Sequence, residues 1–534
     1  MWCTNLPNSV REEFRMLDEY FEGYLMGVDV GTMGVNAMLF DAHGNPLGGA
    51  YREYPSIYPE EHWVEQDAEL VISCVFEVLR EAVCESGVDV GKIRAVSVAS
   101  HRASFGLLDR AGKLLNGRFV VWQDNRGVSE LNFIREKIDD QELHKLTGMP
   151  LAPTYTLSKL VWYKNHLGDF WYSLKRVVFP ADYILSRLGG ELRTEVTNAC
   201  CSGMMDIKRL AWSERIFGLF GFWPSHFAPL VNPGTIIGRI NEETSKLSGL
   251  QEGTLLVTAT GDQQCAAIGA GVVDEGMASL TLGTAGLLVM GTRSINLEKC
   301  PGLMIPSSGI IGLYELEAIQ LGAASCYRWI RDIMALPEKA EGLRQGVSAF
   351  VLMEELLQQS QTGSHGLVFL PFLTGAGYPL WDATAQGTFT GLRFSHTRAD
   401  MIRAVLEGVT IESYDMYQEM RQANVKIKSL AIAGGATASP IWCQTIADTF
   451  GLAVKPLKVQ NATLVAASIF AGIGAGFYRD VKEGVAQSVR YAEAIKPIPK
   501  NTALLQKTHR TYKNLTNTLQ QNNIFSQLIN LREK

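Results

Sequence analysis

One aspartate stands where a carboxylate could act on a bound ligand. Residues Thr254–Thr260 (TLLVTAT) predict a buried strand, which continues through Gly261 into Asp262-Gln263-Gln264 and an alanine-rich helix. The ends of strands are where α/β folds bind ligands. A carboxylate there can accept the proton of a hydroxyl group that attacks a phosphate. Asp262 could instead serve only as the helix cap, and the two roles can coexist.

Two similar turns could bind phosphate groups. Asp29–Gly34 (DVGTMG) and Leu282–Gly286 (LGTAG) each place Gly-Thr between two strand-like runs. Glycines allow backbone N–H groups to approach an anion, and Thr32 and Thr284 add hydroxyl donors. Asp29, at a strand end, could hold Mg²⁺ through water. Each turn taken alone is more typical of an ordinary hairpin.

A third turn has the features of a nucleotide site. The apolar strand within Leu430–Pro440 (LAIAGGATASP) ends in Gly434-Gly435, and side chains there would block a nucleotide at the helix start. Ser439 is the expected N-cap, Pro440 the first helical residue and Gly451 the end of the helix. A well-capped strand–helix loop without a ligand is the alternative.

The three turns and the strand-end aspartate together form a more specific pattern than any one of them does alone. The chain contains no GxxxxGK[ST] P-loop and no HRD or DFG set of protein kinases. Gly472, Gly474 and Gly476 do not have the spacing of a dinucleotide fingerprint, so we interpret them as helix packing or a helix end.

The length of 534 residues predicts two large domains, and the repeated strand–GT–strand unit indicates a weak internal repeat. Alternating strand and helix patterns indicate α/β domains, with a boundary in Gly269–Glu275. The stretch Ala462–Phe477 is too short for a membrane span and predicts a buried helix. Residues 1–24 are too charged for a signal peptide, and translation could start at Met16 or Met26.

Composition narrows the classes of partner. A formal net charge of -6 and the lack of a long Lys/Arg run argue against nucleic-acid binding. The nine cysteines form no CxxC pair, which favours reduced thiols and a cytoplasmic location. We expect no membrane association. The oligomeric state is left open, a homodimer included.

The same motifs resemble those of the FGGY carbohydrate kinases, the family of glycerol kinase and xylulokinase within the actin-like ATPase fold. The resemblance extends from about Leu25 to Arg479. The matching stretches, in chain order, are DVGTMGV from Asp29, His62–Asp67 (HWVEQD), Val121–Arg126 (VWQDNR), Lys159–Trp162 (KLVW), Pro180–Tyr183 (PADY), Thr197–Asp206, GDQQ at 261–264, LGTAG at 282–286, Gly387–Glu407 and Gly434-Gly435. So many ordered matches identify the chain as a member of this family.

The resemblance implies an α/β fold with two ribonuclease-H-like (actin-like ATPase) domains facing across a catalytic cleft. Residues 25–271 are expected to form the sugar-binding domain and residues 272–500 the nucleotide-binding domain. Residues 1–24 would form an N-terminal extension and residues 501–534 a helical tail.

The resemblance also implies roles for single residues, with ATP and Mg²⁺ as cofactors. Asp262 corresponds to the catalytic base, and Asp29 to the aspartate near Mg²⁺, acting through water. The residues expected to bind ATP are Thr32, Gly283, Thr284, Gly434, Gly435 and Ala436. The residues expected to bind the small sugar or polyol are His101, Arg102, Thr154, Asp262 and Gln263.

The expected substrate loop departs from its relatives. Ser100–Ser104 reads SHRAS, where glycerol kinase has QRET and xylulokinase has QMHG. Ala103 thus replaces the Glu and the His that bind substrate hydroxyls, and Thr154 stands where glycerol kinase has Tyr. The loss of a group that hydrogen-bonds the substrate strongly changes the discrimination between substrates, which argues against glycerol as the substrate.

A ketopentose such as xylulose is the expected substrate, because Leu321–Trp329 resembles the corresponding stretch of xylulokinase. The alternatives are glycerol, another polyol, or an autoinducer-type furanone, since the autoinducer kinases share Arg102 and the ending AGIGAG at Ala471–Gly476. Two other classes of protein are a non-catalytic sugar/ATP-binding sensor and an actin- or chaperone-like assembly ATPase. Asp262 and Asp29 argue against the first, and the sugar-kinase stretches against the second.

Overall fold

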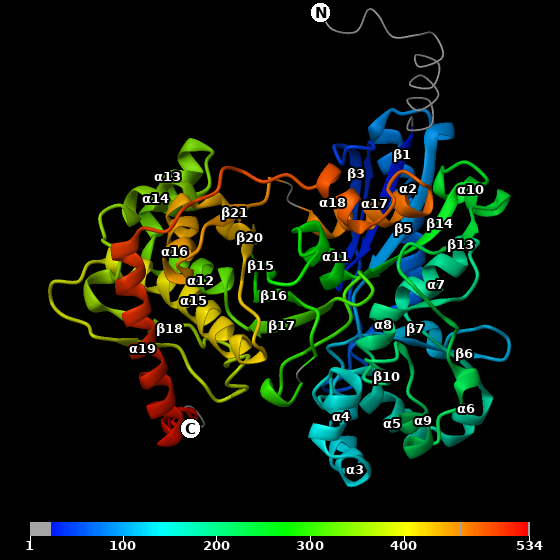
Figure 1. Cartoon of the computed structure of the whole chain (residues 1–534), viewed down its shortest axis with the longest axis horizontal. Helices are drawn as coiled ribbons and strands as arrows, with labels where there is room; N and C mark the ends of the chain where they lie inside the picture. Colours follow the sequence, from blue (N-terminus) through cyan, green and yellow to red (C-terminus); the bar gives the residue numbers. More distant parts are fainter. Residues whose placement is uncertain (1–22, 296, 459–460, 532–534) are drawn as a thin grey trace, which may run out of the picture. The chain divides into compact units, whose positions relative to one another are not determined.

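The computed structural model describes residues 23–295, 297–458 and 461–531, so residues 1–22 of the expected extension lie outside it. The described chain folds into two compact units (Figure 1). The first unit contains the residues up to 269 together with 306–312 and 461–489, and the second contains the remaining described residues.

A six-stranded sheet lies at the centre of the first unit. Its strands, in spatial order, are β13 (Ile236–Arg239), β14 (Leu255–Gly261), β5 (Ile93–Ser100), β1 (Tyr24–Val30), β2 (Gly34–Phe40) and β3 (Pro46–Glu53). β1, β2 and β3 form the antiparallel meander that the turn residues predicted. β1, β5 and β14 run parallel, so Val30, Ser100 and Gly261 end at the same edge of the sheet.

The two longest helices that pack against this sheet are α2 (Ala68–Ser86) and α17 (Ala462–Gly474). α2 is amphipathic and contacts β2 and β3, and the Asp67 side chain accepts the N–H of Leu70 to cap it. α17 is apolar on nearly all sides and contacts β1, β5 and β14. Gly27 permits this close packing, because a Cβ there would lie 2.4 Å from the Leu464 carbonyl oxygen. The predicted buried helix is therefore confirmed.

Many of the remaining elements of the first unit surround a second, largely aromatic core that includes Phe105, Tyr163, Trp171 and Phe217. The helices are α3 (Leu131–Lys137), α4 (Asp140–Thr147), α5 (Thr156–His166), α6 (Gly168–Ser173), α7 (Pro180–Arg187), α8 (Val196–Cys200), α9 (Glu214–Phe220), α10 (Glu242–Ser248), α11 (Asp262–Gly269) and α18 (Val481–Ser488). The short strands are β4 (Glu65–Asp67), β6 (Gly106–Asp109), β7 (Arg118–Val120), β8 (Leu174–Val178), β9 (Thr194–Glu195), β10 (Met205–Asp206), β11 (Ala211–Trp212) and β12 (Leu230–Val231).

The second unit repeats the strand order of the first. Its sheet contains, in spatial order, β17 (Tyr314–Gln320), β16 (Gly286–Thr292), β15 (Met277–Leu282), β20 (Ser429–Gly434) and β21 (Val454–Pro456). The first three strands are antiparallel, and β20 and β21 continue in parallel with β15. The β15–β16 hairpin thus occupies the place of β1–β2, which confirms the internal repeat.

Helices pack on the second sheet and on one another. They are α12 (Ala324–Met334), α13 (Leu336–Gln345), α14 (Ala349–Leu357), α15 (Arg398–Met420), α16 (Pro440–Phe450), α19 (Pro499–Gln521) and α20 (Ile524–Asn530), with a small hairpin of β18 (Val368–Leu370) and β19 (Thr388–Thr390). α19 packs on α15, where His509 Nε2 lies 2.7 Å from Asp415 Oδ1. Within the described part of the chain, no helix combines the length and apolar character needed to cross a bilayer.

The compact units differ from the expected domains at the boundary, at residues 306–312 and in two later segments. Residues 461–489 belong to the first unit, because α17 buries its apolar surface against the first sheet. The expected tail, as far as residue 531, belongs to the second unit, since Tyr512 and Phe525 are buried in a core with Phe372. Sequence order alone does not reveal which sheet a late helix covers.

Candidate active site

Asp262 begins α11 directly after β14, as the sequence predicted. Its Oδ1 accepts the backbone N–H of Gln263 at 2.8 Å, and its Oδ2 lies 3.4 Å from Gln263 Nε2. The side chain remains 23% exposed, so the carboxylate is both tethered and accessible. Asp262 is thus the first residue of the helix, and its carboxylate can still accept further hydrogen bonds.

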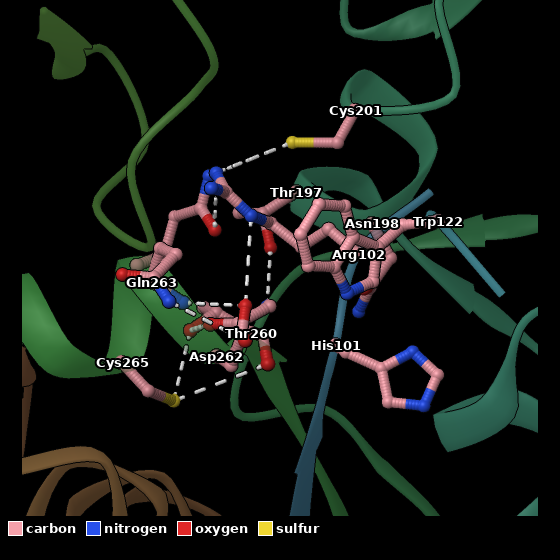
Figure 2. Close-up of polar contacts among 12 residues, drawn as sticks. His101, Arg102, Trp122, Thr197, Asn198, Cys201, Thr260, Asp262, Gln263 and Cys265 are labelled. Atoms are coloured by element: carbon pink, nitrogen blue, oxygen red, sulfur yellow. Dashed lines mark hydrogen bonds and ion pairs between the residues drawn. The ribbon is translucent and has the colours of Figure 1, made fainter. Parts of the chain in front are cut away.

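Arg102 lies beside Asp262 in the first unit (Figure 2). Its Nε is 3.6 Å from Asp262 Oδ1, and its Nη1 is 3.4 Å from Gln264 Oε1. Gly261 makes room for it, because a Cβ there would lie 2.6 Å from Arg102 Cγ. A donor-only guanidinium next to a carboxylate suits an oxygen-rich ligand, to which the arginine donates while the carboxylate accepts.

Asp29 occupies the carboxyl end of β1, in the same sheet as β14, the strand that Asp262 follows. Its Oδ1 is buried and has no hydrogen-bond partner among the described residues. Burial, and secondly the charge of Asp262, raises the pKa of Asp29 to about 7. A buried carboxylate oxygen without a hydrogen-bond partner, near a second carboxylate, suits the oxygen ligation that Mg²⁺ prefers, so the residues fit the expected metal.

The turn that follows β1, which is expected to bind phosphate, is held by its neighbours. Gly31 N–H donates to the Gly34 carbonyl at 2.9 Å, and Thr32 Oγ1 accepts the indole N–H of Trp122 at 2.9 Å. Gln66 Nε2 donates to the Thr32 carbonyl at 2.7 Å. The Trp122 contact, which the sequence analysis missed, joins the phosphate turn to the loop after β7.

His101 is buried at the end of β5, with its Nδ1 2.7 Å from Ser104 Oγ. Burial, with a smaller effect from the nearby Lys159 ammonium, lowers its pKa to about 4, so the ring is neutral at physiological pH. Ser104 Oγ also accepts the N–H of Trp122 at 2.9 Å. In this structure His101 shapes the substrate loop through Ser104.

Thr154 lies on a loop that a buried lysine attaches to the same region. Lys159 Nζ donates to the carbonyls of Thr154, Val121 and Trp122 at 2.7, 3.1 and 3.1 Å. Thr156 Oγ1 donates to the Ala103 carbonyl at 3.2 Å. The loops that carry Ala103, Trp122 and Thr154 are therefore joined by hydrogen bonds, although the sequence places them far apart.

Two of the family stretches meet in a buried ionic network. Arg126 donates to Glu65 Oε1 at 2.7 Å and to both carboxylate oxygens of Asp124 at 2.8 and 2.9 Å. Asp124 Oδ2 also accepts the N–H of Val64 at 2.7 Å, and the guanidinium lies 4.0 Å from the centre of the Trp63 ring. HWVEQD and VWQDNR therefore act here as the structural support of Trp122.

The second unit holds the other predicted turns. The Gly283 and Thr284 carbonyls accept the N–H groups of Ala324 and Ala323 at 2.8 and 3.0 Å, which fixes the β15–β16 turn on the start of α12. Leu282 pairs with Gly434, so this turn lies next to the glycine pair. The expected ATP residues of the second domain thus share one edge of one sheet.

Gly434 has a backbone conformation that only glycine adopts readily, with φ 82° and ψ -167°. Gly435–Ala438 forms a short 3-10 turn, and Ala436 is fully buried. Ser439 Oγ accepts the N–H of Trp442 at 3.0 Å, Pro440 begins α16 and Gly451 ends it, as predicted. A capped helix that starts after a glycine turn is the arrangement in which backbone N–H groups can bind an anion.

Comparisons with known proteins agree with this architecture. The model of the FGGY family of carbohydrate kinases matches with its N-terminal domain at residues 24–269 and its C-terminal domain at residues 278–475. An autoinducer-2 kinase from Enterobacter sp. (strain 638) is 27% identical, with 90% of this chain and 92% of the relative covered. A xylulose kinase from Bacillus subtilis (strain 168) is 26% identical, covering 92% and 96%.

The structure of a ligand-bound xylulose kinase from Lactobacillus acidophilus superimposes with a TM-score of 0.85 and 26% identity, over 93% of this chain and 98% of that one. The two α/β units accordingly have the actin-like ATPase fold of these kinases. The two domain matches together span most of the chain. The protein therefore belongs to the FGGY family of carbohydrate kinases, phosphotransferases with an alcohol group as acceptor.

Proposed function

We propose that this enzyme transfers the γ-phosphate of ATP to a hydroxyl group of a ketopentose such as xylulose, with Asp262 as the base. The observation that carries the proposal is the Arg102–Asp262 pair, at 3.6 Å on a partly exposed surface. The guanidinium can donate to a carbonyl or hydroxyl oxygen of the sugar while Asp262 accepts the proton of the attacking hydroxyl. Xylulose kinases among the relatives support the choice of sugar.

In the proposed mechanism, Thr32, Gly283, Thr284, Gly434, Gly435 and Ala436 bind ATP. Asp29 would hold Mg²⁺ through water, and the ion would neutralise phosphate charge. Arg102 orients the acceptor, with His101, Thr154 and Gln263 shaping its pocket. Asp262 receives the hydroxyl proton as the oxygen bonds to the γ-phosphorus and the bond to the ADP oxygen breaks. The eight free cysteines of the described chain support the cytoplasmic location as part of this proposal.

The role of Asp262 is tested by Asp262→Asn. Loss of the base should lower kcat by about 10²–10⁴-fold, whereas the Kd for ATP should change little. Asp139→Asn is a matched control, because Asp139 caps α4 by accepting the Glu142 N–H at 2.8 Å and lies in no proposed site. A near-normal kcat in Asp262→Asn would disprove the assignment.

The substrate is tested by coupled ADP release with ketopentoses, pentitols, tetritols, glycerol and furanone-type signals. Xylulose should give the highest kcat/KM. An autoinducer-type substrate is the second candidate, favoured by the 27% identical autoinducer-2 kinase. A higher kcat/KM with the furanone would replace the ketopentose proposal, and sugar binding without ADP formation would favour a sensor.

A further inference from the structure

The peptide that carries Asp262 lies where the regular pairing of its strand breaks. β14 pairs with β5 as far as Thr258, and the register shifts before Gly261 pairs with Ser100. The N–H of Gly261 donates to Thr197 Oγ1 at 2.9 Å. A buried donor that loses its partner costs about 1–3 kcal/mol. This hydroxyl therefore fixes the backbone next to the proposed base.

The Thr197 hydroxyl is itself oriented. Thr197 Oγ1 donates its single hydrogen to Glu195 Oε2 at 2.6 Å, so its lone pairs are left to face Gly261. Glu195 caps α8 and accepts the backbone N–H groups of Thr197 and Asn198 at 2.9 and 3.3 Å. Burial raises the pKa of Glu195 to about 8, and the Thr197 hydroxyl opposes this by stabilising the charged form.

The same segment also contacts the partner of Asp262. Arg102 Nη1 donates to Cys201 Sγ at 3.5 Å, and Gln264 Nε2 lies 3.9 Å from the same sulfur. On the other side of the junction, Thr260 Oγ1 donates to the Gly261 carbonyl at 3.1 Å. Residues 195–201 thus contact the groups on which the Arg102–Asp262 geometry depends.

We propose that Thr197, oriented by Glu195, is a positioning residue that holds Asp262 at its reacting distance from the acceptor hydroxyl. The inference rests on the proposed role of Asp262. Thr197 does not itself touch substrate in this account, since its hydroxyl is committed to Glu195 and Gly261. A displacement of about 1 Å in a catalytic group can lower a rate by about 10²-fold.

The test is Thr197→Val, which keeps the shape of the side chain and removes the hydroxyl. We expect kcat to fall by about 10–100-fold with the KM for ATP unchanged, because the nucleotide residues lie elsewhere. Thr197→Ser retains the hydroxyl and should restore kcat to within about threefold. This rescue separates a positioning hydroxyl from the packing of the methyl group.

A matched control lies on β14, the strand that leads into Gly261 and Asp262. Thr258 is 2% exposed, and its Oγ1 donates to the Asn232 carbonyl at 3.0 Å, three residues before the Gly261 junction. Thr258→Val should lower the Tm about as much as Thr197→Val and leave kcat unchanged. Equal losses of kcat in the two variants would show that general destabilisation is the cause.

Glu195→Gln is the second test of the positioning role, to be used if Thr197→Val does not fold. The amide would present N–H groups to Thr197 and disturb the orientation of its hydroxyl, so kcat should fall by several-fold while the ATP KM stays constant. A normal kcat in Glu195→Gln or Thr197→Val would overturn the inference. Asp262→Asn measured alongside distinguishes the failures: if it retains turnover the proposed base is wrong, and if it is inactive only the positioning role fails.

Discussion

Gly434→Ala should damage both the stability of the second unit and its use of ATP. The added Cβ would lie 2.5 Å from the Leu282 carbonyl oxygen and 2.9 Å from its carbon, in a strand that cannot yield as a side chain does. Restoring an ordinary contact of 3.4 Å requires a backbone shift of about 1 Å. The conformation at φ 82° and ψ -167° is also unfavourable for any residue with a Cβ.

The magnitude follows from these two effects. Forcing a non-glycine residue into this backbone region costs about 1–3 kcal/mol, and the overpacking costs a similar amount. A loss of 1 kcal/mol lowers the Tm of a domain of 150–250 residues by about 2–4 °C, so a fall of at least about 4 °C is expected. Because Leu282 leads directly into Gly283 and Thr284, the phosphate turn moves with it, and the KM for ATP should rise at least about tenfold.

Thermal unfolding and ADP release at saturating acceptor measure the two effects. Gly435→Ala is the control, since a Cβ at that neighbouring glycine has its nearest contact at 3.9 Å. Its Tm should be unchanged, and any rise in its ATP KM would report the space that the nucleotide needs. The reasoning is refuted if Gly434→Ala retains the parent Tm and the parent KM for ATP.

Two further substitutions test the substrate region. Arg102→Lys should raise the acceptor KM by about 10–100-fold, with the ATP KM unchanged in the same steady-state assay, because a point charge does not replace the guanidinium fork. His101→Gln should remove a loss of stability that the parent shows at acidic pH. Folding lowers the pKa of His101 from 6.5 to about 4. The unfolded chain therefore binds a proton that the folded chain does not, and the parent loses up to about 3 kcal/mol of folding free energy between pH 6.5 and pH 4. Urea unfolding at pH 7 and pH 4.5 measures that difference, and equal pH dependence in parent and variant contradicts it.

The parts of the fold that could be predicted from the sequence are those determined by interactions between residues close together in the chain. The capped start of α16 at Ser439, its end at Gly451 and the step from β14 to Asp262 depend on residues a few positions apart. Gly474 is another example: it packs against Val257, and Gly476, with φ 81°, follows the helix end, as the packing interpretation required. The residues that form turns and helix caps act on their immediate neighbours, so these features can be recognised from the sequence without knowledge of the fold.

The supports of the site depend on contacts that no local pattern records. Thr197 is 64 residues from Gly261, and Trp122 is 90 residues from Thr32, yet each pair is joined by a hydrogen bond. From the sequence, Lys159 would be expected to be an ordinary basic residue of a helix. In the structure it is fully buried, and its ammonium group donates hydrogen bonds to three carbonyl groups. Such residues become recognisable only when the topology has brought their partners together.

The site of the first unit has two sets of supports that meet at one residue. Asp262 is held through Gly261 by Thr197, whereas the loops that carry Ala103 and Thr154 are held by Lys159, Ser104 and Thr156. Arg102 belongs to both, since it extends from the substrate loop to Asp262. Ala103 itself is buried with φ 59° and offers the ligand no side-chain hydrogen bond. Under the proposed role of Asp262, selectivity for the acceptor can therefore diverge on the loops while the proposed base keeps its position.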